Sequence, residues 1–195
     1  MKVTKAQAQA NRAHIVETAS HLFRERGYDG VGIADLMAAA GFTHGGFYKH
    51  FGSKADLMVE AARCGFEQGK AKAEGFDEPA FVSYYLSRKH RDDRADGCTI
   101  AALSADAARQ PASTKEAFAA GIESLLQGIS DGDGTQDLGG RGDCDLRARR
   151  LDTLAQVVGA LVLSRACPDD SPLADEILEV CRAAVLSRLA PTGSA

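Results

Sequence analysis

The sequence has no uninterrupted run of about 20 apolar residues, which argues against a membrane-spanning helix and a membrane partner. Its first residues are polar and contain no apolar segment of the kind found in secretory leaders, so we expect a cytoplasmic protein. Convincing runs of alternating β-branched residues are also missing. Apolar residues instead recur at helical spacing throughout, and this predicts an all-α fold.

The cysteines form no Cys-x-x-Cys pair and are odd in number: Cys64, Cys98, Cys144, Cys167 and Cys181. This spacing favours reduced thiols over a disulfide framework or a zinc site. There is likewise no phosphate-binding glycine loop after a strand, no metal-ligand spacing and no defensible Ser/His/Asp arrangement. We therefore expect a protein that is not an enzyme and that holds neither a metal nor a cofactor.

Charge is distributed unevenly along the chain. Residues 1–58 contain seven Lys and Arg against five Asp and Glu, whereas the rest of the chain is acidic and brings the formal net charge to −4. Four of the five histidines also lie in the first part. This asymmetry indicates an anion-binding N-terminal end on an acidic body.

Apolar periodicity, capping residues and glycines predict about nine helices, over 4–26, 33–40, 44–51, 53–72, 79–87, 99–110, 113–129, 147–166 and 172–189. Thr4 and Ser53 have the side chains and spacing of N-caps, and Gly27 and Gly41 are expected to end helices. The Gly/Asp-rich residues 130–143 predict a flexible loop. We expect a first domain over 1–52 and a larger helical domain over 53–195, with a linking helix from 53.

Two short helices joined by a tight turn at Gly41, behind a longer helix, are what a helix-turn-helix requires. Phe47 and Phe51 are four residues apart and are expected to face the core. The residues that face away from the core then carry hydrogen-bond donors, aromatic rings or small groups and no carboxylate, which suits binding to phosphates. They are Thr43, His44, Gly45, Tyr48, Lys49 and His50. A helix-turn-helix kept only for packing against another protein would have no need of these donors.

The same segment resembles the DNA-binding signature of the TetR/AcrR regulators. The resemblance covers about residues 10–60, and its most specific part is Phe47-Tyr48-Lys49-His50-Phe51-Gly52-Ser53-Lys54. Weaker similarity to one branch of that family's ligand-binding domains runs through residues 96–103 and 107–110. The resemblance implies a homodimeric transcriptional regulator, a repressor that binds a palindromic DNA operator and leaves it when an unidentified small-molecule effector binds.

The resemblance also implies roles for individual residues. Tyr48, His50 and Lys54 match positions that hold phosphates, and a second group matches positions that face bases or backbone: Thr43, His44, Gly45 and Lys49. Gly45 and Gly46 allow two interpretations. They bring the backbone close to DNA, or the helix tolerates them because phenylalanines anchor it.

The last two predicted helices are expected to pair with their copies in a second subunit. The segment 154–163 is apolar nearly all round, which indicates burial on more than one side. The proposed interface residues are Leu154, Val158, Leu161, Ile177, Val180 and Ala184. The alternative is a monomer in which these helices form the core under long loops.

Candidate residues for an effector cavity are aromatic side chains and one thiol: Phe66, Phe81, Tyr84, Tyr85, Cys98 and Phe118. Most of these side chains are expected to be ordinary core. Cys98 follows Gly97 at a predicted helix start, where the helix dipole lowers a thiol's pKa. This leaves open an alternative function, regulation through a redox- or electrophile-sensing thiol, against a packed and inert cysteine.

Overall fold

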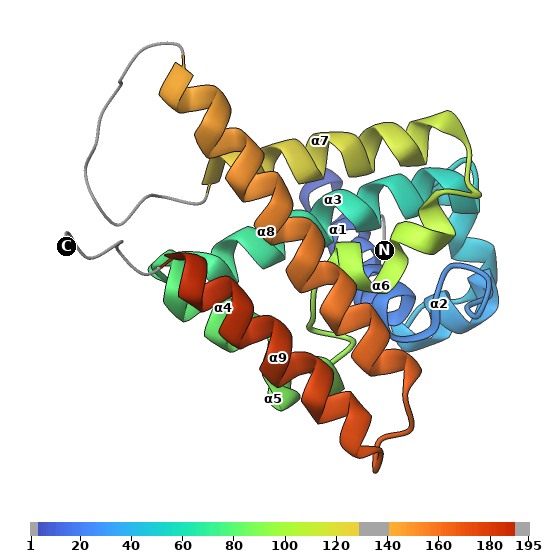
Figure 1. Cartoon of the computed structure of the whole chain (residues 1–195). Helices are drawn as coiled ribbons and strands as arrows, with labels where there is room; N and C mark the ends of the chain where they lie inside the picture. The colour runs from blue at the N-terminus through green and yellow to red at the C-terminus, as the bar shows by residue number, and fades with distance from the viewer. Residues whose placement is uncertain (1–3, 129–140, 190–195) are drawn as a thin grey trace, which may run out of the picture. The chain divides into compact units, whose positions relative to one another are not determined.

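A computed structural model describes residues 4–128 and 141–189, and within these ranges every regular element is a helix, as the sequence predicted (Figure 1). In chain order they are α1 (Lys5–Arg26), α2 (Ile33–Ala39), the 3-10 helix η1 (His44–Lys49), α3 (Lys54–Ala73), α4 (Glu78–Tyr85), α5 (Arg88–Asp92), α6 (Thr99–Ala107), α7 (Ala112–Gly128), α8 (Arg141–Ala166) and α9 (Pro172–Leu189). None of the helices in the described ranges is both long enough and apolar enough to cross a membrane.

Local sequence accounts for where several helices begin and end. The Thr4 hydroxyl accepts a hydrogen bond from the Gln7 amide at 3.1 Å, and Ser53 caps α3 through the Asp56 amide at the same distance. Each bond satisfies a backbone donor that the first turn leaves free. Gly27 and Gly41 end their helices with φ values of 76° and 78°, a backbone region that favours glycine.

Two differences from the predicted elements lie beyond residue 87. The five-residue helix α5 was not predicted; Ser87 caps it by accepting from the His90 amide at 3.2 Å. Helix α8 begins at Arg141 rather than at 147, so the end of the predicted loop is helical. The remainder of that loop, 129–140, lies outside the described residues.

Packing divides the chain into two compact units. One comprises the described residues up to Ala71 together with Arg94–Ile122, and it contains α1, α2, η1 and α6. The other comprises Lys72–Asp93 and the described residues from Glu123 on, with α4, α5, α8 and α9. The predicted division at residue 52 concerns function and stays a prediction.

In the second unit, α8 and α9 lie side by side along most of their length (Figure 1). Val157 and Leu161 of α8 and Val185 of α9 are fully buried. Leu161 was predicted to lie at a subunit interface; it is fully buried in the single chain, and its place at an interface stays a prediction.

A buried arginine ties α5 to the end of α8. Arg91 is 1% exposed and donates to the Ser164 hydroxyl at 3.0 Å, to the Cys167 carbonyl at 3.1 Å and to Asp169 at 2.9 Å. Burial of a guanidinium is tolerated only when its donors are satisfied in this way. The second unit is therefore held by a polar network as well as by apolar packing.

Candidate DNA-binding site

The turn between α2 and η1 has a fixed backbone geometry. The Phe42 amide donates to the Met37 carbonyl at 2.7 Å, and the Gly41 amide donates to Ala38 at 3.0 Å. These two bonds, with Gly41 in the left-handed region, form a Schellman motif. Hydrogen bonds within the protein therefore fix the backbone conformation of the turn in the helix-turn-helix.

The second helix of the motif differs from the predicted one. It was expected as an ordinary helix over 44–51, but it is a 3-10 helix over His44–Lys49. The Gly46 amide donates to Thr43, and the His50 amide donates to Phe47, both at 2.9 Å and both three residues back. Two consecutive glycines favour no helix strongly, and 3-10 geometry occurs in short pieces of this kind.

The inner face of η1 is anchored by phenylalanines, as predicted. Phe47 is fully buried and Phe51 is 4% exposed, and their ring centroids are 5.4 Å apart. Arg12 of α1 stacks over Phe51 at 4.8 Å, donates to the His50 carbonyl at 3.3 Å and pairs with Glu60 of α3. Sequence reasoning did not identify Arg12, because its partners are 38 and more residues away.

The outer edge of η1 carries the predicted contact residues at the surface. Tyr48 is 63% exposed, and its ring stands edge-on to His44 at 6.3 Å. Thr43, Gly45 and Lys49 are also exposed. Thr43 is the N-cap, yet its hydroxyl makes no capping bond, and the Lys49 ammonium meets no partner within the described ranges. Donors on this edge therefore remain available to a ligand.

The other predicted contact residues are less exposed. Gly46 and His50 are half-buried. Lys54 is also half-buried, and its ammonium donates to the Tyr28 carbonyl at 2.5 Å. The phosphate contact predicted for Lys54 stays a prediction, and the structure adds an internal role, since this side chain holds the loop between α1 and α2.

That loop has a second partner that sequence reasoning missed. The Tyr28 amide donates to Asp106 of α6 at 3.0 Å. Burial, and secondarily the negative charge of Asp106, raise the pKa of the Tyr28 phenol well above its ordinary value. Residues 28 and 106 are 78 positions apart, so helical periodicity contains no trace of their contact.

The candidate effector residues divide between the two units. Phe66 and Phe118 are buried in the first unit with ring centroids 5.4 Å apart, and Cys98 is the half-buried N-cap of α6 there. The other three aromatic residues belong to α4 in the second unit: Phe81, Tyr84 and Tyr85. The effector cavity and the thiol sensor both stay predictions.

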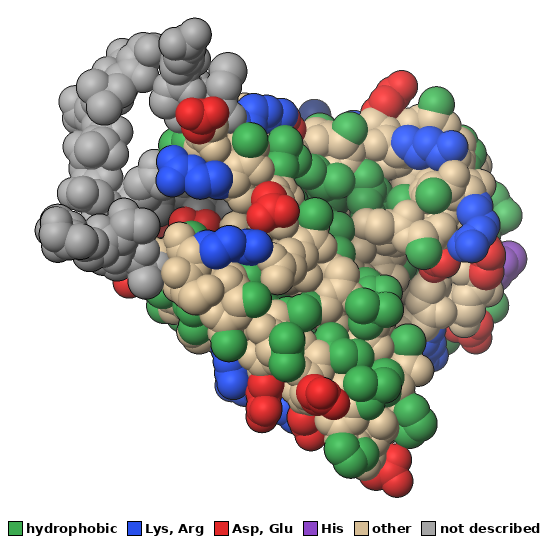
Figure 2. Space-filling model, viewed as in Figure 1, with side chains coloured by type: hydrophobic (Ala, Val, Ile, Leu, Met, Phe, Trp, Pro, Cys, Tyr) green, Lys and Arg blue, Asp and Glu red, His purple; other side chains and the backbone are tan. Residues whose placement is uncertain are grey.

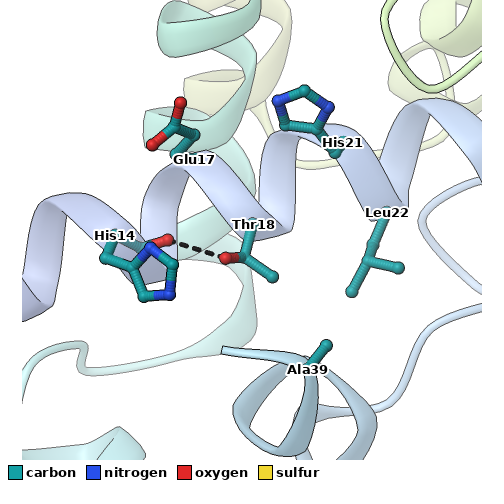
Figure 3. Close-up of a pocket in the computed structure, with 6 residues that line it drawn as sticks. All are labelled: His14, Glu17, Thr18, His21, Leu22 and Ala39. Atoms are coloured by element: carbon teal, nitrogen blue, oxygen red, sulfur yellow. Dashed lines mark hydrogen bonds between the residues drawn. The ribbon is translucent and has the colours of Figure 1, made fainter. Parts of the chain in front are cut away.

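A shallow pocket lies between α1 and α2 in the first unit (Figure 3). It is lined by His14, Glu17, Thr18, His21, Leu22 and Ala39. The Thr18 hydroxyl donates to the His14 carbonyl at 2.9 Å, and the two histidine rings point to different parts of the pocket. Among the described residues no group of three His, Cys, Asp or Glu side chains is placed to hold a metal.

Apolar side chains gather on the outer surface of the α8–α9 pair (Figure 2). The most exposed large ones are Leu151, Val162, Leu163, Leu173 and Val180. Of the interface residues predicted from sequence, Val180 and Ala184 are exposed, and three are half-buried: Leu154, Val158 and Ile177.

The helix-turn-helix segment matches a known family model. Residues 15–61 match the model described as bacterial regulatory proteins, tetR family. The regulator AcrR of Shigella flexneri is 40% identical over 57 residues, 29% of this chain and 26% of that protein. The repressor BepR of Brucella suis is 34% identical over 82 residues, 40% of this chain and 39% of its own. The chain therefore spans between a quarter and two-fifths of these relatives' lengths.

Solved structures extend the similarity of fold to nearly the whole chain. A TetR regulator from Chloroflexus aurantiacus superposes with a TM-score of 0.69 at 23% identity, covering 95% of this chain and 97% of that one. AibR, solved in complex with isovaleryl coenzyme A and operator DNA, has a TM-score of 0.53 at 17% identity, with coverages of 90% and 97%. Residues 15–61 therefore belong to the tetR family of bacterial regulatory proteins, and the chain as a whole shares the all-helical fold of solved TetR regulators.

Proposed function

We propose that this protein is a sequence-specific DNA-binding transcriptional regulator. The observation that carries the proposal is the two-sided character of η1. Phe47 and Phe51 lock one side into the core, while the other presents Tyr48 and Lys49 to solvent with no carboxylate beside them. A short helix with an outward cationic and hydroxyl-bearing edge, held by a rigid turn, suits entry into the major groove.

Contacts on this edge divide by their chemistry. Tyr48, His50 and Lys54 would bind phosphates and fix the register, which positions the protein without reading sequence. His44 and Lys49 would reach base edges, where lysine and other donors meet the acceptors of guanine. Residues 1–52 form the DNA-binding domain in this proposal, and 53–195 form the effector-binding and dimerisation domain.

The regulator would act as a homodimer through α8 and α9. Five large apolar side chains on these helices are more than two-fifths exposed, as expected of a surface that a partner covers. Gly159 lies on α8, and a Cβ built there would meet nothing within 4 Å in the chain. Glycine inside a helix costs about 1 kcal/mol relative to alanine. The packing of this chain alone does not require glycine at position 159. The close approach of a partner helix would account for it.

A dimer explains how such a protein would read DNA and respond to a ligand. Two recognition helices enter successive major grooves when they are about 34–36 Å apart, so a symmetric dimer selects an inverted repeat. A small molecule that favours a different separation of the recognition helices would release DNA, so the protein would act as a repressor. Its place of action in this proposal is the cytoplasm. AibR, which was solved with both a small molecule and operator DNA, supports this combination on the same fold.

Selection of duplexes from a random DNA pool by the purified chain tests the proposal. We expect enrichment of an inverted repeat, with half-sites one helical turn or a multiple apart. Lys49→Ala should bind the enriched duplex more weakly, and Lys115→Ala, which removes another exposed lysine, on α7, serves as the matched control. A pool that shows no enrichment, or equal binding by both variants, would overturn the proposal.

A further inference from the structure

Two charged side chains hold the backbone of a single residue, Tyr28, in the loop between α1 and α2. Asp106 of α6 accepts a hydrogen bond from the Tyr28 amide at 3.0 Å, and Lys54 of α3 donates to the Tyr28 carbonyl at 2.5 Å. The Tyr28 side chain is 1% exposed and stands edge-on to Phe23 at 5.0 Å. Backbone and side chain of Tyr28 are therefore held from three sides.

The backbone on either side of Tyr28 leaves little room for another arrangement. Gly27 has a φ of 76°, and a Cβ placed on it would lie 2.7 Å from the Asp106 carboxylate. A Cβ on Gly30 would lie 2.2 Å from the Arg26 carbonyl oxygen. The loop thus runs closely against both α1 and Asp106, and it leads directly into the helix-turn-helix.

Contacts with α1 and with the loop that follows it lie at both ends of α6. Just before α6 begins, Arg24 donates to the Ala95 carbonyl at 2.6 Å, and His21 lies 3.3 Å from Asp96. Asp106 provides the contact at the far end. It is the second-last residue of α6, where the helix dipole disfavours a carboxylate, and Arg109 is 4.0 Å away. The Tyr28 amide, at 3.0 Å, is thus nearer to this carboxylate than Arg109 is.

We propose that Asp106 is a positioning residue for DNA binding. By accepting from the Tyr28 amide, it holds the start of the helix-turn-helix against α6. This inference rests on the proposed function and deepens it. It names Asp106 as the residue that links the DNA-binding segment to α6, the helix that begins after the half-buried Cys98.

Removal of the Asp106 carboxylate changes DNA affinity in opposite directions depending on its role. A positioning role predicts weaker binding, whereas a purely electrostatic role predicts stronger binding. Asp106→Ala makes the protein less acidic, and that change alone would strengthen binding to DNA. Loss of a hydrogen bond to a charged group predicts instead about tenfold weaker binding to the selected duplex. Asp106→Asn keeps an acceptor oxygen and should restore binding to near the wild-type value. Glu116→Ala, an exposed carboxylate on α7, is the matched control for charge.

Amide hydrogen exchange at Tyr28 provides a second readout that needs no DNA. We expect faster exchange in Asp106→Ala and wild-type protection in Asp106→Asn and Glu116→Ala. Asp106→Ala that binds the duplex as tightly as Glu116→Ala, or Asp106→Asn that fails to restore binding, would overturn the inference. A wild-type protein that enriches no duplex would instead overturn the proposed function, so the two failures are distinguishable.

Discussion

Gly45→Ala should stabilise the free protein and weaken its binding to DNA. Gly45 is exposed, a Cβ built there meets nothing within 4 Å, and its φ lies outside the left-handed region. The fold therefore does not need glycine at this position. Alanine restricts the unfolded chain, which predicts an increase of about 0.4–1 kcal/mol in the free energy of unfolding. If DNA backbone or bases approach the Gly45 backbone, the added methyl group forces a gap in that interface.

The expected loss of DNA affinity follows from the cost of overpacking a close contact. Inserting a methyl group into a well-packed region costs about 1–3 kcal/mol. Because 1.4 kcal/mol is about tenfold in affinity, we expect binding to the selected duplex to fall by tenfold or more. Urea unfolding and electrophoretic titration of the same preparation measure the two effects.

Gly46→Ala is the comparison variant, because a Cβ on Gly46 would face the protein, whereas a Cβ on Gly45 would face open space. A Cβ at Gly46 would lie 3.5 Å from the Met37 methyl group and 3.8 Å from the Thr43 hydroxyl, which are ordinary contacts within the protein. Because this methyl group would be directed into the protein, we expect Gly46→Ala to lower DNA affinity less than Gly45→Ala does. Gly45→Ala that is more stable and binds DNA equally well would refute the close-approach argument and favour a helix that merely tolerates glycine.

Three further predictions concern other parts of the molecule. Lys54→Ala should weaken binding to every duplex and reduce the slope of log affinity against log salt by about 1, measured by titration at several salt concentrations; an unchanged slope would contradict the phosphate contact. Val180→Glu should shift the protein to monomer in sedimentation equilibrium without lowering the free energy of monomer unfolding, since the side chain is 61% exposed; a persistent dimer would argue against the α8–α9 interface. Arg91→Leu should lower the free energy of unfolding by about 3 kcal/mol, because it removes the donor to the Cys167 carbonyl and the bonds to the Ser164 hydroxyl and carbonyl; a loss below about 1 kcal/mol in urea unfolding would show that the buried network contributes little.

Local sequence predicted the parts of the fold that depend on local chemistry. Thr4 and Ser53 cap helices as their spacing indicated, and Gly27 and Gly41 end helices at the expected residues. The burial of Phe47, with Tyr48 exposed beside it, follows from helical spacing alone. The candidate site was therefore visible as a face of one short segment.

Contacts between distant segments were not predictable from the same patterns. Arg12 meets Glu60 across 48 residues, and Tyr28 meets Asp106 across 78, so neither pair leaves a periodic pattern. Leu161 carries the same apolar character whether it faces its own chain or a second copy, and only the packing of α8 decides between them. Helix α5 is too short, at five residues, for periodicity to identify it.

The central claim, that the outer edge of η1 reads DNA bases, is tested most directly by repeating the duplex selection with Lys49→Ala. Lys49 is exposed on η1 and has no partner among the described residues, so its removal should leave the fold intact. We expect the enriched inverted repeat to persist but to lose base preference at one symmetric pair of positions. An enriched motif identical to that of the wild type would contradict the claim.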